Sequence, residues 1–348
     1  MAHIEQRKNG WRAQVRRRGM PSASKTFDLK SDAESWAREL EREAQRGNIA
    51  ALRQDAQRVT VGEVMDRYLA GPVQAMKSAK DVRTRLSRAR ERFGAHYLSN
   101  VRGVDLSAWR DDLLQEGLAP QTVIHHINAL SALFSFVEKD LSIDLPAGNP
   151  ARKVRKPAAP KGRDRRLRPG ELEALLQAAT STGRVVGLRE VFILAVETSM
   201  RLGELLGLEW SRIDLAKCTA HLVDTKNGES RTVALSVAAM GALRALPRRI
   251  DGRVFGWAAA DSFEKAWTRC KTRARRLYEA DCAAQGIKPD PAFLADLRFH
   301  DLRHEAISRL FEKGLGIMKV SKMSGHKSLQ MLGRYTHVDA QKLAPELG

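Results

Sequence analysis

Cysteine is scarce in this chain of 348 residues, and the three that occur, Cys218, Cys270 and Cys282, form no CxxC pair and have no histidine at a metal-ligand spacing. Neither a disulfide framework nor a zinc site is therefore indicated. Long apolar runs are also lacking, since the longest, residues 191–196, is far too short to span a bilayer, and the first residues hold no apolar signal segment. We expect no membrane association and a cytoplasmic location at the nucleoid.

Acidic residues are too few to balance the basic ones. The 60 Lys and Arg outnumber the 41 Asp and Glu, which leaves a net charge of +19 and a pI near 10.2, and the excess is spread along the chain. Because each phosphate that a basic side chain neutralises releases bound counterions, such a surface favours nucleic acid as the partner. The charge alone also fits a merely soluble protein or attraction to a membrane surface.

The first 58 residues predict a small β-β-α module. Apolar and cationic residues alternate over 11–16, which is the pattern of a strand with two different faces, and residues 25–29 fit a second strand. Ser31 and Glu34 match a capping box that opens a helix. The cationic strand face suits a DNA groove, although a solvated sheet face gives the same pattern.

Helical patterns dominate the next part of the chain. Thr60 and Glu63 match a second capping box. Further helices are predicted over residues 79–93, 104–116 and 120–138. The last of these has apolar residues at helical spacing, which indicates the core of a helical bundle: Val123, Ile127, Leu130, Leu133, Phe134 and Val137.

A segment rich in Pro, Gly, Lys and Arg, residues 147–166, follows and is typical of a linker. Its cations, among them Arg163, Arg165 and Arg166, would neutralise phosphates if two domains closed around a duplex, or the segment is a plain tether. The rest is mostly helical, but two short strand patterns flank Asn227-Gly228, a strong hairpin signal that places Lys226 at or just before the tip.

The fold class that follows is mainly α with small β elements (α+β). We predict an N-terminal β-β-α module of the arm-binding type, a helical core-binding domain, a basic linker, and a mixed, mostly helical catalytic domain with a β-hairpin. Their predicted bounds are residues 1–58, 59–146, 147–166 and 167–348.

The last third of the chain holds residue types suited to cutting a phosphodiester. Arg201 and Arg303 can each grip two phosphate oxygens, since guanidinium groups stay charged and are forked. His300 and His326 can exchange a proton or donate a hydrogen bond, and the hydroxyl of Tyr335 can attack phosphorus. Taken singly, each of these residues fits a structural role as well, because most arginines, histidines and tyrosines only pack or face solvent.

A metal site is a weaker interpretation of the same region. His300 and His304 have the spacing of a zinc-binding pair on a helix. The metalloprotease pattern, however, requires Glu directly after the first His, and Asp301 occupies that position. We therefore expect catalysis without a metal.

Six residues in this order and at these separations resemble the tyrosine recombinases, also called the phage integrase family. They are Arg201, Lys226, His300, Arg303, His326 (preceded by Gly325) and Tyr335. The resemblance is strong over residues 163–339. It extends in kind to the helical region before them and only loosely to the N-terminal module.

The resemblance implies a reaction. Tyr335 attacks the scissile phosphate to give a 3′-phosphotyrosyl link and a free 5′-hydroxyl, and the hydroxyl of a partner strand reverses the step. Arg201 and Arg303 hold the phosphate, while His300 acts in proton transfer.

The resemblance also implies the roles of the remaining residues and the partners. Lys226 protonates the leaving oxygen, His326 adds a hydrogen bond, and Glu204 orients its neighbours. No cofactor is needed, because the phosphotyrosyl bond retains the energy of the bond that was cut. The expected partners are double-stranded DNA recombination sites, further copies of the chain in a synaptic homotetramer, and accessory DNA-bending proteins.

Three stretches resemble, within the family, the shufflon-specific inverting recombinases of conjugative plasmids: residues 162–167, 225–231 and 299–309. The N-terminal module fits phage or island integrases at least as well, so integration, excision and inversion all stay open. A type IB topoisomerase would share the chemistry. A decayed recombinase kept as a DNA-binding regulator would lack at least one catalytic position, and none is missing.

His326 and Tyr335 are nine positions apart, which in one straight helix is about 13 Å of rise. Both can reach one phosphate only if the chain turns between them, and Ser328 is a candidate cap for a helix that carries Tyr335 back. Otherwise Tyr335 serves the site of a neighbouring protomer. The sequence leaves cleavage in cis and cleavage in trans open.

Overall fold

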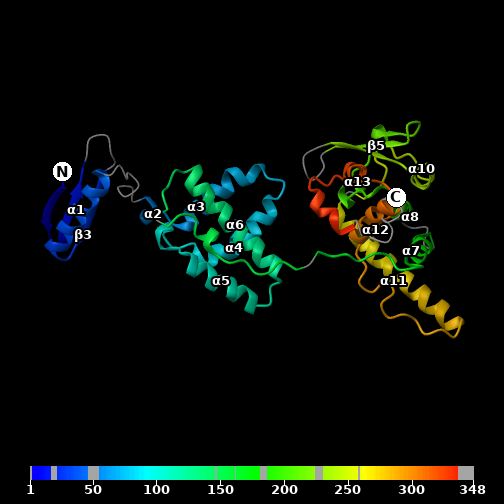
Figure 1. The fold of residues 1–348 in the computed structure, drawn as a ribbon, viewed down its shortest axis with the longest axis horizontal. Helices are drawn as coiled ribbons and strands as arrows, with labels where there is room; N and C mark the ends of the chain where they lie inside the picture. Colours follow the sequence, from blue (N-terminus) through cyan, green and yellow to red (C-terminus); the bar gives the residue numbers. More distant parts are fainter. Residues whose placement is uncertain are drawn as a thin grey trace, which may run out of the picture. The chain divides into compact units, whose positions relative to one another are not determined.

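The structure is a computed structural model that describes residues 2–16, 22–45, 55–145, 147–160, 162–180, 186–223, 230–257 and 259–335. The chain divides into two compact units, Met1–Lys161 and Gly162–Gly348, and Figure 1 labels most of their helices. Among the described residues, no helix is both long and apolar enough to cross a membrane.

The N-terminal module is a three-stranded antiparallel sheet with one helix. Its elements are β1 (Ala2–Arg7), β2 (Gly10–Val15), β3 (Ala23–Phe27) and α1 (Lys30–Gln45), and the strand order is β1-β2-β3. Small apolar side chains such as Ala13, Ala33 and Ala37 form the contact between sheet and helix. The two predicted strands and the helix are present. Strand β1 was not predicted, because Ile4 is the only large apolar residue that it adds to the core.

The first unit continues as a helical bundle that agrees with the sequence analysis to within one residue at most helix ends. It contains α2 (Asp55–Arg58), α3 (Val61–Ala70), η2 (Pro72–Ala75), α4 (Ala79–Phe93), η3 (Leu98–Asn100), α5 (Gly103–Gln115), α6 (Pro120–Lys139) and η4 (Pro150–Lys153). The capping box at α3 is confirmed, since Thr60 Oγ1 accepts from Glu63 N at 3.2 Å and Glu63 Oε2 accepts from Thr60 N at 2.7 Å. All six predicted core residues of α6 are buried.

The segment expected to be a linker is packed at both ends. On one side, Ala151 and Val154 are buried in the core of the helical bundle. On the other, Arg163, Arg165 and Arg166 form ion pairs with carboxylates of the second unit. These three arginines therefore bind protein carboxylates, which is a different use from the phosphate neutralisation that their composition suggested.

The second unit is mostly helical, with one small sheet. Its elements are α7 (Glu171–Thr180), α8 (Leu188–Thr198), α9 (Leu202–Leu206), η5 (Trp210–Arg212), β4 (Ile213–Asp214), β5 (Thr219–Leu222), β6 (Arg231–Ala234), α10 (Val237–Arg244), α11 (Ala260–Ala284), α12 (Phe299–Glu312), α13 (Ile317–Ser324), η6 (Leu329–Met331) and η7 (Gly333–Tyr335). Strands β5 and β6 pair antiparallel, as the hairpin signal predicted. The hairpin tip, with Lys226, lies outside the described residues.

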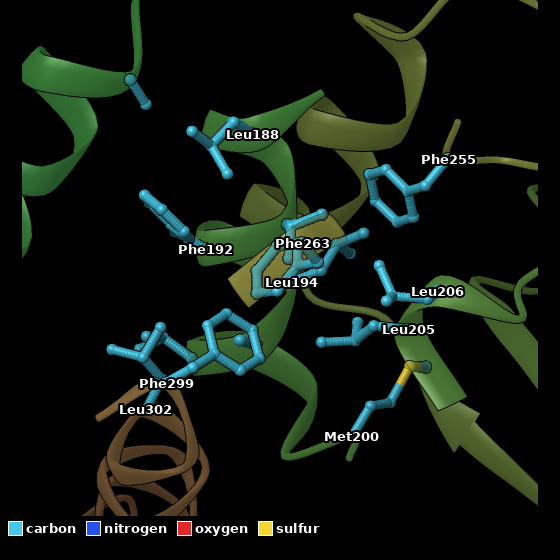
Figure 2. Close-up of a cluster of buried hydrophobic side chains, with 14 of the residues drawn as sticks. Leu188, Phe192, Leu194, Met200, Leu205, Leu206, Phe255, Phe263, Phe299 and Leu302 are labelled. Carbon is cyan, nitrogen blue, oxygen red and sulfur yellow. The ribbon is translucent and has the colours of Figure 1, made fainter. Parts of the chain in front are cut away.

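One apolar core joins the two sequence motifs that carry the candidate arginines. Figure 2 shows Met200 and Leu205, which flank Arg201 and Glu204, in the same cluster as Phe299 and Leu302, which flank His300 and Arg303. The ring of Phe299 also packs edge-on against Phe263 at 4.7 Å between centroids. Burial of these flanking side chains fixes the backbone from which the polar residues project.

Candidate active site

Arg303 lies at the centre of the candidate site. Its side chain projects from α12, is only 4% exposed, and donates hydrogen bonds to the carbonyl oxygens of Ser199 and Ser324, the latter at 2.7 Å. No carboxylate among the described residues is within ion-pair distance of it. Burial, followed by the charge of Arg201, lowers the pKa of Arg303 to about 9, so the group is still a cation at neutral pH. A bound anion would offset the cost of burying that charge.

Arg201 and Glu204 occupy the start of α9 beside this cation. Glu204 Oε2 accepts from Arg201 N at 2.8 Å, and Arg201 Nη1 donates to Glu204 Oε1 at 2.8 Å. The other guanidinium nitrogen, Nη2, donates to the carbonyl oxygen of Gly325 at 3.4 Å. Arg201 therefore meets the same turn of the chain, residues 324–325, that Arg303 contacts.

A third arginine, Arg231 on β6, completes the charged cluster and was not predicted. Its Nη1 and Nη2 donate to the two oxygens of Glu204 at 2.8 and 2.6 Å, and its Nε donates to the carbonyl oxygen of Met323 at 3.2 Å. The one signal in the sequence is strand alternation, which places Arg231 on the same face as buried Val233.

Within the described part of the chain, Glu204 is the one carboxylate that bonds both Arg201 and Arg231. Burial raises its pKa, but the hydrogen bonds from Arg231 and Arg201 outweigh burial, and the net effect lowers the pKa. Three guanidinium groups, those of Arg201, Arg231 and Arg303, thus surround one negative charge. A cavity of about 330 Å³ lies beside Arg201 and Glu204.

The backbone is strained at Ser199, whose carbonyl oxygen contacts Arg303. Ser199 ends α8 in the left-handed conformation, with φ of 56°. Its carbonyl oxygen accepts from Arg303, and its buried hydroxyl has no hydrogen-bond partner among the residues described. Strained residues and unsatisfied buried groups persist where the surrounding structure holds them, and they cluster at functional sites.

His326 follows the end of α13, where Gly325 adopts φ of 69° and turns the chain. Its Nδ1 lies 2.7 Å from Ser324 Oγ, and its carbonyl oxygen accepts from Ser321 Oγ at 2.7 Å. Burial, and then the charges of Arg303 and Arg201, lower its pKa to about 4. His326 is therefore neutral at pH 7 while no anion is bound.

Tyr335 is brought back to the same region by the turn at Gly325 and two short 3₁₀ turns, η6 and η7. The turn required by the sequence spacing is thus present, but the helix expected after Ser328 is not, and Ser328 makes no capping hydrogen bond through its side chain. Tyr335 is 8% exposed and packs on Ile307 and Val320. Burial raises its pKa, while the charges of Arg334 and Arg303 oppose that rise.

The histidine that contacts Tyr335 is His304. Its Nδ1 is hydrogen-bonded to the hydroxyl of Tyr335, and the two rings stack at 5.7 Å with an interplanar angle of 26°. His300, to which the family resemblance gives proton transfer, is exposed at the surface of α12, and its ring meets His304 edge-on at 5.0 Å. The sequence had singled out His304 only as one half of a pair at zinc-binding spacing, against which the residue Asp301 argues.

The structure thus gathers five of the seven predicted residues, Arg201, Glu204, Arg303, His326 and Tyr335, into one region of the second unit. His300 lies at its edge, and Lys226 falls outside the described part of the chain. The family model described as "Phage integrase family" matches residues 165–342, which contain all seven.

The chain belongs to the phage integrase family. It is 38% identical over 258 residues to a shufflon-specific DNA recombinase of Escherichia coli, a match that covers 72% of this chain and 61% of that protein. It is 33% identical over 341 residues to a putative integrase/recombinase of Haemophilus influenzae, covering 93% of this chain and 84% of the relative.

The fold agrees with solved integrases. A lambda integrase, crystallised as a tetramer bound to a Holliday junction, superposes with a TM-score of 0.60 at 20% sequence identity, and the match covers 97% of each chain. The mainly helical fold with small antiparallel sheets, predicted from the sequence, is therefore confirmed as an integrase fold.

Proposed function

We propose that this integrase cuts and rejoins double-stranded DNA through a covalent bond between Tyr335 and a DNA 3′-phosphate. The observation that carries the proposal is the buried cation of Arg303, which has no carboxylate partner among the described residues and lies close enough to Tyr335 to influence its pKa. A phosphodiester bound there neutralises the guanidinium and places phosphorus near the tyrosine hydroxyl.

The phosphate would be held chiefly by Arg201 and Arg303. Glu204 and Arg231 fix Arg201 from behind, because the carboxylate hydrogen-bonds both guanidinium groups at once. His326 would add a hydrogen bond, since the phosphate charge favours its protonated form. Preorganised donors of this kind stabilise the charge that develops on the phosphate oxygens during attack.

The leaving 5′-oxygen requires a proton, and we assign that role to Lys226 on the strength of the family resemblance. In the sequence, Lys226 lies between the end of β5 and the start of β6. Arg231, the first residue of β6, is bonded to Glu204 and to the chain near Gly325, which ties the base of the hairpin to the phosphate site.

We further propose that the chain consists of an arm-type DNA-binding module (1–58), a core-binding domain (59–146), a linker (147–166) and a catalytic domain (167–348). The net charge of +19 supports a DNA partner. By analogy with the lambda integrase tetramer on a Holliday junction, four copies would meet in the synaptic complex, with accessory DNA-bending proteins where the site needs them. Its place of action would then be the nucleoid.

Inversion is the outcome that the comparison supports best, because the 38% identity to the shufflon-specific recombinase spans 72% of this chain. A plasmid carrying two inverted candidate sites tests it. Inversion predicts a flipped segment between them, whereas an enzyme of integration or excision acts on sites in direct repeat or on separate molecules.

The covalent step can be tested with a nicked suicide substrate drawn from DNA flanking the gene. Cleavage beside the nick releases a short 5′-hydroxyl oligonucleotide, so rejoining fails and the adduct accumulates. We expect the adduct with the full chain in EDTA and none with Tyr335→Phe, which should still bind the DNA. A strict need for Mg²⁺, or relaxation of supercoils without strand exchange, would contradict the proposal.

A further inference from the structure

His304 lies one helical turn after His300 on α12 and is 7% exposed. One of its nitrogens, Nδ1, is hydrogen-bonded to the hydroxyl of Tyr335, and its ring is stacked on the tyrosine ring. Two separate contacts, one polar and one between ring faces, therefore fix Tyr335 against this residue. Among the residues that the structure describes, no comparable contact joins Tyr335 to His326 or to an arginine side chain, apart from Arg334, whose guanidinium lies 5.2 Å from the centre of its ring.

The direction of the hydrogen bond follows from the protonation states. Burial, the nearby His300 and Arg334 lower the pKa of His304 to about 4, with Arg303 adding to this and Asp301 opposing it. Tyr335 has a raised pKa and keeps its proton. A neutral imidazole facing a protonated phenol accepts through its bare nitrogen. The hydroxyl hydrogen of Tyr335 accordingly points at Nδ1, and Nε2 carries the imidazole hydrogen.

We infer that His304 is a catalytic residue that orients the hydroxyl of Tyr335 and accepts its proton as the phosphotyrosyl bond forms. The inference rests on the proposed function, in which Tyr335 is the nucleophile. In the step, the O–H bond of Tyr335 breaks and the proton passes to Nδ1, the bond from the phenolic oxygen to phosphorus forms, and the bond from phosphorus to the 5′-oxygen breaks. The 5′-oxygen takes a proton from the general acid, and rejoining reverses every transfer.

The geometry also explains why a weak base suffices. The proton moves as negative charge builds on phosphate oxygens held by Arg201 and Arg303, so the phenol becomes more acidic during attack. The bound phosphate and the negative charge of Asp301 favour the protonated form of His304. A positioned general base typically contributes about 10²- to 10⁴-fold to a rate.

Three variants of the full chain test this role in single-turnover adduct formation on the nicked substrate. His304→Phe keeps a ring to pack on Tyr335 but removes Nδ1. His304→Asn keeps an oxygen that can accept the hydroxyl hydrogen but cannot hold the proton. His300→Phe tests the competing histidine one turn away, to which the family resemblance gives proton transfer, and Tyr335→Phe runs in parallel.

We expect His304→Phe to slow the adduct by about 10²- to 10⁴-fold, with DNA binding within about threefold of wild type. Solvent hydroxide must then take the proton, so the rate should rise about tenfold per pH unit between pH 6 and 8, where the wild-type profile is flat. The defect should persist on a substrate whose 5′-leaving atom is sulfur and needs no proton, because only the attacking side is impaired. His304→Asn should recover part of the rate and keep the sloping profile.

Several results would overturn the inference. A wild-type rate in His304→Phe, or a slower rate with a flat pH profile, would make His304 a packing residue only. The sloping profile in His300→Phe instead would give His300 the proton. If His304→Phe does not fold, a flat wild-type profile in His304→Asn rejects the role. An adduct in Tyr335→Phe would refute the proposed function itself, a separate failure.

Discussion

The ion pair between Arg163 and Asp301 is expected to hold α12, the helix that carries Arg303, in place. Arg163 Nε and Nη2 donate to the two oxygens of Asp301 at 2.7 and 2.8 Å. Asp301 is 0% exposed and also caps α12 by accepting from Arg298 N at 2.8 Å. Because Asp301 stands between His300 and Leu302 in that helix, replacing Arg163 with Ala should disturb both stability and cleavage.

The magnitude follows from burial. Removing one partner of a buried pair costs about 3 to 5 kcal/mol, because a charge is left without compensation. Arg163 is 26% exposed, and Asp301 keeps the hydrogen bond from Arg298, so we expect a smaller loss than for a fully buried pair, about 2 to 4 kcal/mol. For a domain of about 150 to 250 residues each kcal/mol shifts Tm by about 2 to 4 °C, which predicts a fall of roughly 4 to 16 °C.

Arg168→Ala is the matched control in the same segment. Arg168 pairs with Asp290 at 2.7 Å, the same distance, but both side chains are exposed and the pair is screened by solvent. Scanning calorimetry of the full chain should show the transition of the second unit lowered by Arg163→Ala and unchanged by Arg168→Ala. Hydrogen exchange in residues 299–312 should speed up only in the first variant. Equal effects of the two substitutions would refute the reasoning from burial.

Three further predictions concern the charged cluster and His304. Gly325→Ala should lower the cleavage rate at least about tenfold, because the new Cβ would lie 2.9 Å from Arg231 Nη1. Gly314 also has a positive φ, but a Cβ added there would have no atom within 4 Å, so Gly314→Ala should cost only the backbone strain of about 1 to 2 kcal/mol in stability. Single-turnover cleavage and Tm of both variants separate the two effects, and equal losses of cleavage would contradict the clash. Glu204→Gln should slow cleavage about tenfold or more, because Arg201 and Arg231 lose their shared carboxylate. The variant should bind DNA at least as tightly as wild type in a filter-binding assay, since the site loses a negative charge. Weaker DNA binding would contradict this role of Glu204. As pH falls from about 6.5 to 4, His304 is protonated in the unfolded chain before it is protonated in the folded chain, so the free energy of unfolding should fall by up to about 3 kcal/mol. Urea titrations at several pH values should show that His304→Phe removes this part of the dependence of the unfolding free energy on pH. An unchanged dependence would place the protonation at another group.

The helical parts of the fold were predictable because their signals are local. The capping box of Thr60 and Glu63 sets the start of α3, and Pro120 with the apolar stripe behind it sets α6, so neither depends on distant residues. Strand β1 carries little apolar alternation and is stabilised by pairing with β2, a partner that its own sequence does not reveal.

The site was predictable only in part, for a related reason. Arg201, Arg303 and Tyr335 stood out through the family pattern, whereas Arg231 and His304 act through contacts with residues 27 and 31 positions away. Arg163 likewise had the composition of a linker and pairs with a carboxylate 138 positions away. A single sequence shows that such a residue is charged or titratable, but it does not show which distant residue it contacts in the fold.

The identity of the residue joined to DNA is the most direct test of the function. The trapped adduct can be digested with a protease and a nuclease, and the peptide that retains a nucleotide can be sequenced by mass spectrometry. We predict a single modified residue, Tyr335, linked to the 3′-phosphate, together with a released strand that a kinase can label at its free 5′-hydroxyl. A nucleotide on any other residue, or a link to a 5′-phosphate, would contradict the proposed chemistry.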